Sequence, residues 1–269
     1  MIRALFLSMF FVLPAAAADV SLTGRVEQGG LVVGTAQPGA KITYGKQDIP
    51  VTPDGKFLLG IGRDAPATGE LLVVSSDGTK STQKFTIAPR AWEIEKVDGV
   101  PQALVTPDPV LMEKIGAENK LMYAAYMTLE LTPFFQTGFI RPAEGRKSGT
   151  FGSQRILNGS PMAAHSGLDI AGPIGTPIHA AADGIVTLSH PMMIMTGNTI
   201  VLNHGYGLET IYIHMSKILV KDGDHVKQGD VIGEIGMTGR ANGPHLHFGA
   251  TWFNTRIDPE TLLAVLPAR

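Results

Sequence analysis

The length, composition and charge of the chain exclude several classes of protein. Its 269 residues are enough for two domains, and 17% charged with 44% hydrophobic residues is ordinary for a globular protein rather than a disordered one. The formal net charge of -2 argues against a nucleic-acid-binding protein, which would present a basic surface. The chain has no cysteine, which excludes disulfides and cysteine-ligated metal sites.

The first residues have the features of a secretory signal peptide. Arg3 is followed by an apolar run over residues 4–13 and then by alanines at 15–18, which provide an A-x-A cleavage site. The apolar run is far shorter than the ~20 residues that a membrane-spanning helix needs. We therefore expect residues 1–18 to be a signal peptide, with the mature protein exported to the periplasm or the extracellular space and carrying no membrane anchor.

Residues 19–90 are predicted to form a separate β module. Turn sequences such as Asp54-Gly55 and Asp77-Gly78 separate short β-rich runs at regular spacing, which favours a small β-sandwich of immunoglobulin type. The predicted strands cover residues 20–23, 31–34, 41–44, 56–59 and 71–74. No cluster of acids, histidines or aromatics marks a catalytic site here. A structural role, or the binding of a protein partner, is expected for this module.

Residues 91–137 are predicted to be a helical connector. Asp108-Pro109 places a capping residue before a proline at the first helical position. Apolar residues then recur at helical spacing and predict a packing face: Leu111, Ile115, Met122, Ala125 and Leu129. From about Gly138 to the end, many short β-rich runs are separated by glycine turns, and a closing helix is expected over 259–265.

Histidines and one aspartate in the C-terminal part carry the chemical signal. They occur as His165-Ser166-Gly167-Leu168-Asp169, as an isolated His214, and as His245-Leu246-His247. Alternation along a strand would point His245 and His247 the same way. The glycine at 167 favours a bend followed by a short strand that turns Asp169 toward a cleft. Two imidazoles and one carboxylate are a usual ligand set for catalytic zinc, although each motif alone is weak evidence.

The segments around these residues resemble lysostaphin-like zinc endopeptidases, the family that includes LytM. The resemblance covers about residues 138–260 in unbroken order and rests on the following segments: 152–155, 158–159, 165–171, 175–177, 181–186, 197–201, 203–207, 212–216, 229–233, 236–240 and 243–248. It implies a mainly β chain, in which an immunoglobulin-like sandwich and a connecting helix precede an antiparallel β LytM-type peptidase domain over residues 138–269.

The resemblance also implies the roles of five residues. The family's ligands for one zinc ion fall on His165, Asp169 and His247, and its two catalytic histidines fall on His214 and His245; no separate site for an organic cofactor is implied. None of the five is substituted. The chain has no H-E-x-x-H motif, so a histidine must take the proton of the attacking water. His245 is expected to be the general base and His214 to stabilise the oxyanion, although the two roles could be exchanged.

The implied function is hydrolysis of peptide cross-links between the stem peptides of bacterial cell-wall peptidoglycan. The bond that is cut stays open, because loop shape determines the groove. The main alternative is a non-catalytic LytM-domain protein that binds and activates other cell-wall hydrolases. A further alternative is an active domain held latent by the β module or the connector.

Overall fold

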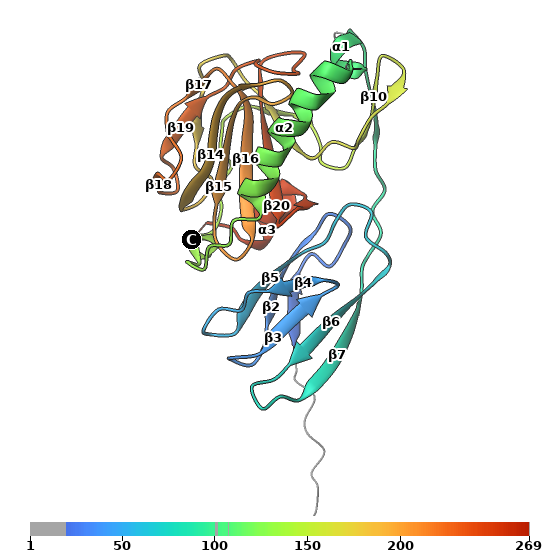
Figure 1. Ribbon diagram of the computed structural model, residues 1–269, viewed down its shortest axis with the longest axis vertical. Coiled ribbons are helices and arrows are strands. Elements are labelled where there is room, and N and C mark those ends of the chain that lie inside the picture. The colour runs from blue at the N-terminus through green and yellow to red at the C-terminus, as the bar shows by residue number, and fades with distance from the viewer. Residues whose placement is uncertain (1–19, 100–101, 107, 269) are drawn as a thin grey trace, which may run out of the picture.

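The computed structural model describes residues 20–99, 102–106 and 108–268 (Figure 1). The predicted signal peptide therefore lies outside the described residues. The chain is mainly β, with an N-terminal β part, a helical segment and a C-terminal β part in that order. Among the helices described, none is both long and apolar enough to cross a membrane.

The N-terminal part consists of two small antiparallel sheets that face each other across apolar side chains. One sheet has the order β1-β2-β5, with β1 (Ser21–Gly24), β2 (Leu31–Thr35) and β5 (Lys56–Gly60). The other has the order β4-β3-β6-β7, with β3 (Lys41–Tyr44), β4 (Gln47–Ile49), β6 (Thr68–Val74) and β7 (Lys80–Thr86). Residues such as Val32, Ile42 and Phe57 are buried between them. Five of these strands were predicted, and β4 and β7 were not.

The connector contains more than helices. Its principal helix, α2 (Pro109–Tyr126), begins as predicted, because the Asp108 carboxylate accepts a hydrogen bond from the Leu111 amide at 2.8 Å. The predicted packing face is correct only at the end of α2, where Met122 and Ala125 are buried. Leu129 lies beyond the helix and is 55% exposed, so its place in that face was wrong. The connector also holds α1 (Gln102–Val105) and a strand, β8 (Ile94–Val97), that was not predicted.

The C-terminal part is built on an eight-stranded sheet of order β18-β14-β15-β16-β20-β12-β9, with β21 pairing with β20. The long central strands are β14 (Gly184–Met193), β15 (Gly197–Asn203), β16 (Leu208–Met215) and β20 (His245–Trp252). The others are β9 (Arg146–Gly149), β12 (Gly167–Ala171), β18 (His225–Val226) and β21 (Thr255–Ile257). All neighbouring pairs are antiparallel, as the family resemblance implied for this part.

Smaller elements surround this sheet. A three-stranded sheet has the order β13-β19-β17, with β13 (Pro177–His179), β17 (Lys217–Ile218) and β19 (Val231–Glu234). A second joins β11 (Ser160–Pro161) and β10 (Gln154–Leu157) to β8 of the connector, which runs parallel to β10. The remaining elements are a 3-10 turn, η1 (Phe134–Thr137), and the closing helix α3 (Pro259–Val265), which has the predicted bounds.

The two faces of the large sheet have different coverings. On one face α2 lies across β14, β15 and β16 (Figure 1), where Met122 and Tyr126 pack with Ile211 and Ile213. The opposite face, with residues such as Phe248, belongs to the principal core. Since Ile213 is directly opposite His247 in the β16–β20 register, α2 covers the same face from which His247 projects.

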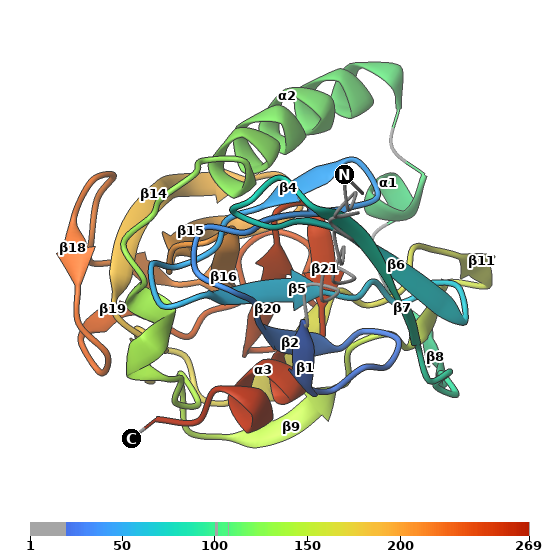
Figure 2. The ribbon, with the colours of Figure 1, turned by 90° about the horizontal axis from the view of Figure 1, so that it is seen from below.

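The N-terminal part packs directly on the C-terminal part, and buried residues of both form one continuous core. Strand β5 contacts β20 and β21, as the view from below shows (Figure 2). Gly60 is needed at this contact, because a Cβ there would lie only 2.5 Å from the Cβ of Trp252. Arg90 adds an ion pair of 2.9 Å with Asp258, whose carboxylate caps α3.

A buried carboxylate lies under the end of α2. Glu209 is fully buried, and within the described part of the chain neither its carboxylate oxygens nor the Tyr126 hydroxyl has a hydrogen-bond partner. The Arg256 guanidinium carbon lies 4.6 Å from the centroid of the Tyr126 ring. Burial raises the pKa of Glu209 well above its usual range, and the nearby Arg256 offsets only part of this. Glu209 is therefore protonated at pH values where an exposed glutamate is ionised.

This burial predicts a pH-dependent effect of the Glu209→Gln substitution. Because the native state holds the Glu209 proton more tightly than the unfolded chain, its contribution to stability is complete below pH ~4.5 and is lost as the pH rises. The glutamine variant should unfold near the wild-type temperature at about pH 5 and about 2–4 °C higher at about pH 9. Thermal unfolding across this range tests it, with Glu70→Gln on exposed β6 as the control. A difference in unfolding temperature between Glu209→Gln and the wild type that does not change with pH would contradict the prediction.

Candidate metal centre

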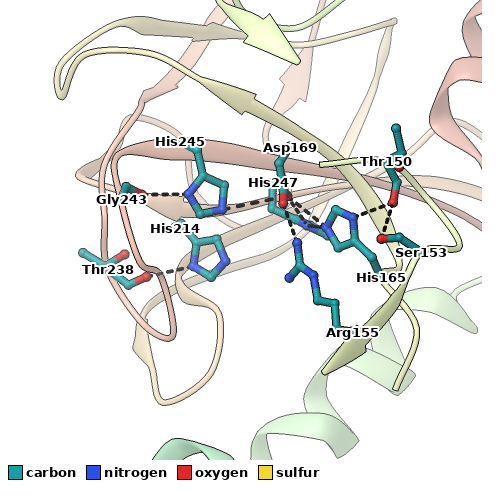
Figure 3. Close-up of polar contacts among 10 residues, drawn as sticks. All are labelled: Thr150, Ser153, Arg155, His165, Asp169, His214, Thr238, Gly243, His245 and His247. Carbon is teal, nitrogen blue, oxygen red and sulfur yellow. Dashed lines mark hydrogen bonds and ion pairs between the residues drawn. The ribbon is translucent and has the colours of Figure 1, made fainter. Parts of the chain in front are cut away.

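Strand pairing brings the predicted site residues together on one face of the large sheet. In the β12–β20 register, Asp169 is directly opposite His247, and Ala171 is opposite His245. Directly opposite residues share a face, and so do residues two apart on a strand, so Asp169, His245 and His247 project to the same side. His165 lies just before β12, which begins at Gly167. Figure 3 shows the resulting cluster.

Three of these residues converge on one point. His165 Nε2 lies 3.0 Å from Asp169 Oδ1 and 2.9 Å from His247 Nδ1, and His247 Nδ1 lies 2.8 Å from Asp169 Oδ1. All three side chains are buried. The triangle therefore contains two imidazole nitrogens and one carboxylate oxygen, with little access to water.

The hydrogen bonding of His165 shows that this donor set fits a cation. Its Nδ1 lies 2.9 Å from the Thr150 carbonyl oxygen, which can only accept, so Nδ1 carries the proton and Nε2 presents a lone pair in the neutral ring. A proton on His247 could satisfy only one side of the triangle. A metal ion accepts from all three atoms at once, and a second ring nitrogen bonded to a carbonyl is the usual arrangement for a metal-binding histidine.

The local electrostatics favour the metal-binding protonation states. Burial lowers the pKa of His247 to about 4, against the opposing effect of Asp169, so its ring is neutral near pH 7. Burial acts to raise the pKa of Asp169, but the hydrogen bonds and charges of His165 and His247 outweigh it and hold this pKa far below its usual range. The site therefore offers an ionised carboxylate at Asp169 and a neutral imidazole at His247.

Arg155 on β10 completes the surroundings of Asp169. Its Nη2 donates to Asp169 Oδ2 at 2.7 Å, which satisfies the oxygen that does not face the two histidines. Arg155 lies in one of the segments that resemble the family, but the resemblance implies no role for it. No spacing rule connects residue 155 to residue 169, and their contact depends on the fold of the loop between them.

We expect Arg155→Gln to weaken metal binding about 10- to 100-fold, the usual cost of removing a partner that orients a metal ligand. The glutamine cannot hold the Asp169 carboxylate by a charged hydrogen bond. Competition against a chromophoric chelator measures the dissociation constant. Lys147→Gln on the neighbouring β9 is a matched control, because Lys147 is an exposed cation paired with Glu260. Equal affinities in the two variants would contradict this role for Arg155.

His214 and His245 lie beside the triangle with their rings 4.8 Å apart, measured between centroids. His245 Nδ1 donates to the Gly243 carbonyl and His214 Nδ1 donates to the Thr238 carbonyl, both at 2.8 Å. Each ring therefore has an unprotonated Nε2 in its neutral form, and His245 Nε2 lies 3.8 Å from Asp169 Oδ1 (Figure 3). Both rings thus present an unprotonated nitrogen beside the triangle of His165, Asp169 and His247.

The backbone at His214 is unusual. His214 has a φ of +66° near the end of β16, a conformation that costs free energy for a residue with a side chain. Its amide donates to Thr196 O at 2.8 Å, and its carbonyl accepts from the Thr238 amide at 3.3 Å. Burial, together with His245 and His247 nearby, lowers the pKa of His214 to about 3. His214 is thus held beside the site as a neutral ring.

Comparisons with known proteins agree with this site. Residues 163–259 match the model of peptidase family M23. Over 89 residues the chain is 49% identical to the peptidoglycan DD-endopeptidase ShyA of Vibrio cholerae, covering 32% of this chain and 20% of that protein. Over 103 residues it is 39% identical to the DD-carboxypeptidase/endopeptidase Mpg of Neisseria meningitidis, covering 38% and 24%. The match thus spans only about a fifth to a quarter of these relatives.

One solved structure matches almost the whole chain. A Pseudomonas aeruginosa crystal structure, described as a candidate M23 peptidase, has a TM-score of 0.71 and 27% identity. The match covers 90% of this chain and 96% of that one, so the N-terminal β part belongs to the shared fold as well as the C-terminal part.

Proposed function

Because residues 163–259 of this chain belong to peptidase family M23, we propose that the chain is an endopeptidase that hydrolyses peptide cross-links in bacterial peptidoglycan. The observation that carries the proposal is the convergence of His165, Asp169 and His247, with His214 and His245 beside them. The relatives ShyA and Mpg are named as a peptidoglycan endopeptidase and a carboxypeptidase/endopeptidase, which supports the same substrate class.

The proposed metal is one zinc ion per chain, held by His165, Asp169 and His247. Two histidines and a carboxylate are a common zinc set in hydrolases, and the described residues bring no softer ligand to this triangle. When bound, zinc lowers the pKa of a water ligand toward neutrality and polarises a carbonyl. The protein contributes the orientation of the ligands through Thr150 and Arg155.

His245 is proposed as the general base and His214 as the group that stabilises the oxyanion. The unprotonated Nε2 of His245 can accept a proton from the attacking water, while Gly243 holds the ring through Nδ1. His214 must carry a proton on Nε2 to stabilise an oxyanion, and its low pKa means that this proton has to be acquired during the reaction. This requirement keeps the exchange of the two roles open.

The proposed organisation follows the sequence expectations. We propose a signal peptide over 1–18, a β module over 19–90, a connector over 91–137 and a peptidase domain over 138–269, with export to the periplasm or the extracellular space. The two-sheet arrangement with orders β1-β2-β5 and β4-β3-β6-β7 supports an immunoglobulin-like module. A protein partner for this module stays a proposal.

One observation supports the latent alternative. Helix α2 packs on the same sheet face as the site, through Tyr126, Ile211 and Ile213. In the latent alternative, α2 would restrict access to the His165, Asp169 and His247 site until it moves. The retention of all five site residues argues against a purely non-catalytic activator of other hydrolases.

The test uses the chain from residue 19 to residue 269 on purified cross-linked muropeptides. We expect conversion of dimers to monomers, loss of this conversion with a chelator, and recovery when zinc is restored. Product masses then identify the bond that is cut. Bound zinc without any cleavage would favour the latent form, whereas neither zinc nor cleavage would favour the activator.

A further inference from the structure

The loop formed by residues 150–153 in the peptidase part makes hydrogen bonds to both the backbone and the ring of His165. The His165 amide donates to Ser153 O and the Gly152 amide donates to His165 O, both at 2.8 Å. The ring donates to Thr150 O at 2.9 Å, and the Ser153 hydroxyl donates to the same oxygen at 3.1 Å. The position of residues 150–153 therefore determines the direction in which His165 Nε2 points.

The N-terminal part of the chain and the start of the connector hold this loop in place. Arg63, which follows β5, donates from Nε to Gly152 O at 2.7 Å. Its guanidinium carbon lies 5.1 Å from the centroid of the Trp92 ring, and Trp92 packs edge-on against Phe151 at 5.9 Å. Gly152 has a φ of +81°, and a Cβ there would lie 2.2 Å from the Trp92 ring. The close packing of Gly152 against the Trp92 ring therefore requires a residue without a side chain.

A cavity lies between this loop and the N-terminal part. The cavity, of about 510 Å³, is bordered by Phe151, by residues 164–166 and, from the N-terminal part, by Tyr44 and Arg63. On this side the His165 segment faces open space rather than packed side chains. Movement of the loop is therefore opposed by the Arg63 hydrogen bond and the Trp92 packing, and release of either would leave it room to shift.

We propose that the N-terminal β module and the start of the connector are part of the metal centre, in which Arg63 of the module and Trp92 of the connector are positioning residues that fix His165 through loop 150–153. The inference rests on the proposed metal-dependent function, which it deepens. The module then supports the metal site directly and is not a separable attachment. The chain of contacts is short: Arg63 holds Gly152, and residues 150–153 hold His165.

The experiment measures Co²⁺ binding to the full chain by competition and by the visible absorption of the cobalt-loaded protein. Arg63→Gln should weaken Co²⁺ binding about 3- to 10-fold, less than a direct partner of a ligand would, and alter the absorption spectrum. Arg90→Gln is the matched control. The Arg90 guanidinium carbon also lies over the Trp92 ring, 4.6 Å from its centroid, and Arg90 joins the two parts through its ion pair with Asp258. The Arg90→Gln substitution leaves the hydrogen bond from Arg63 to Gly152 in place.

A second variant protects the test against a general loss of folding. Gly152→Ala keeps Arg63 but pushes the loop away from Trp92, so it should also weaken Co²⁺ binding and change the spectrum. Thermal unfolding identifies variants that are folded. Folded Arg63→Gln and Gly152→Ala proteins with wild-type affinity and spectrum would overturn the proposal, as would an equal loss in Arg90→Gln. Failure of the wild-type chain to cleave muropeptides would instead count against the proposed function, since the cobalt titration needs no activity.

Discussion

The His247→Ala variant is expected to lose stoichiometric zinc and to cleave cross-links at least about 10³-fold more slowly than the wild type. The substitution removes one of three converging ligand atoms and leaves His165 and Asp169 as an incomplete pair. A bound metal ion contributes several kcal/mol to catalysis of this kind, and each 1.36 kcal/mol corresponds to about tenfold in rate.

Metal analysis of the purified variant, together with the rate of muropeptide cleavage, measures this effect. His225→Ala on the exposed β18 is the control, because it removes a histidine far along the sheet from the triangle. The control should keep both zinc and activity. Full zinc content and wild-type cleavage in His247→Ala would remove this residue from the ligand set.

The His245→Ala variant should separate proton transfer from metal binding. Its ring is held by Gly243 and is not one of the three converging atoms, so zinc content should stay at one per chain. Loss of a positioned general base typically lowers kcat about 10²- to 10⁴-fold. Zinc analysis and kcat are measured on the same preparation, again beside His225→Ala. Normal turnover, or loss of zinc together with turnover, would contradict the proposed role.

Local signals in the sequence mark the starts of the helices α2 and α3. The starts of α2 and α3 follow from Asp-Pro pairs at 108–109 and 258–259, in which the aspartate caps the helix and proline occupies its first position. These interactions lie within three residues along the chain. The predicted packing face extended too far, because Leu129 follows the helix and faces solvent.

The missed strands lack an apolar pattern of their own. Strand β7 contains Lys80, Lys84 and several small polar residues, and its place in the sheet follows from seven paired positions with β6 rather than from an apolar pattern of its own. Strand β8 pairs with β10, more than fifty residues further along the chain. Strand β8 therefore has no local signature, whereas β7 follows the Asp77-Gly78 turn but lacks the apolar alternation that would identify it as a strand.

At the site, the sequence predicted the five charged or imidazole side chains but not the groups that orient them. Backbone carbonyls of Thr150, Thr238 and Gly243 have no sequence signature, because every residue carries one. Arg155 reaches Asp169 only once β10 has folded beside the sheet. The hydrogen bond from Arg63 to Gly152 likewise depends on how the two β parts pack against each other.

The most direct test of a metal-dependent site is the anomalous scattering of zinc in crystals of the protein. The account predicts a single peak per chain within about 2.0–2.2 Å of His165 Nε2, Asp169 Oδ1 and His247 Nδ1. His214 and His245 should lie beside the peak without bonding to it. A crystal with zinc at another position, or with no peak in this triangle at saturating zinc, would contradict the account.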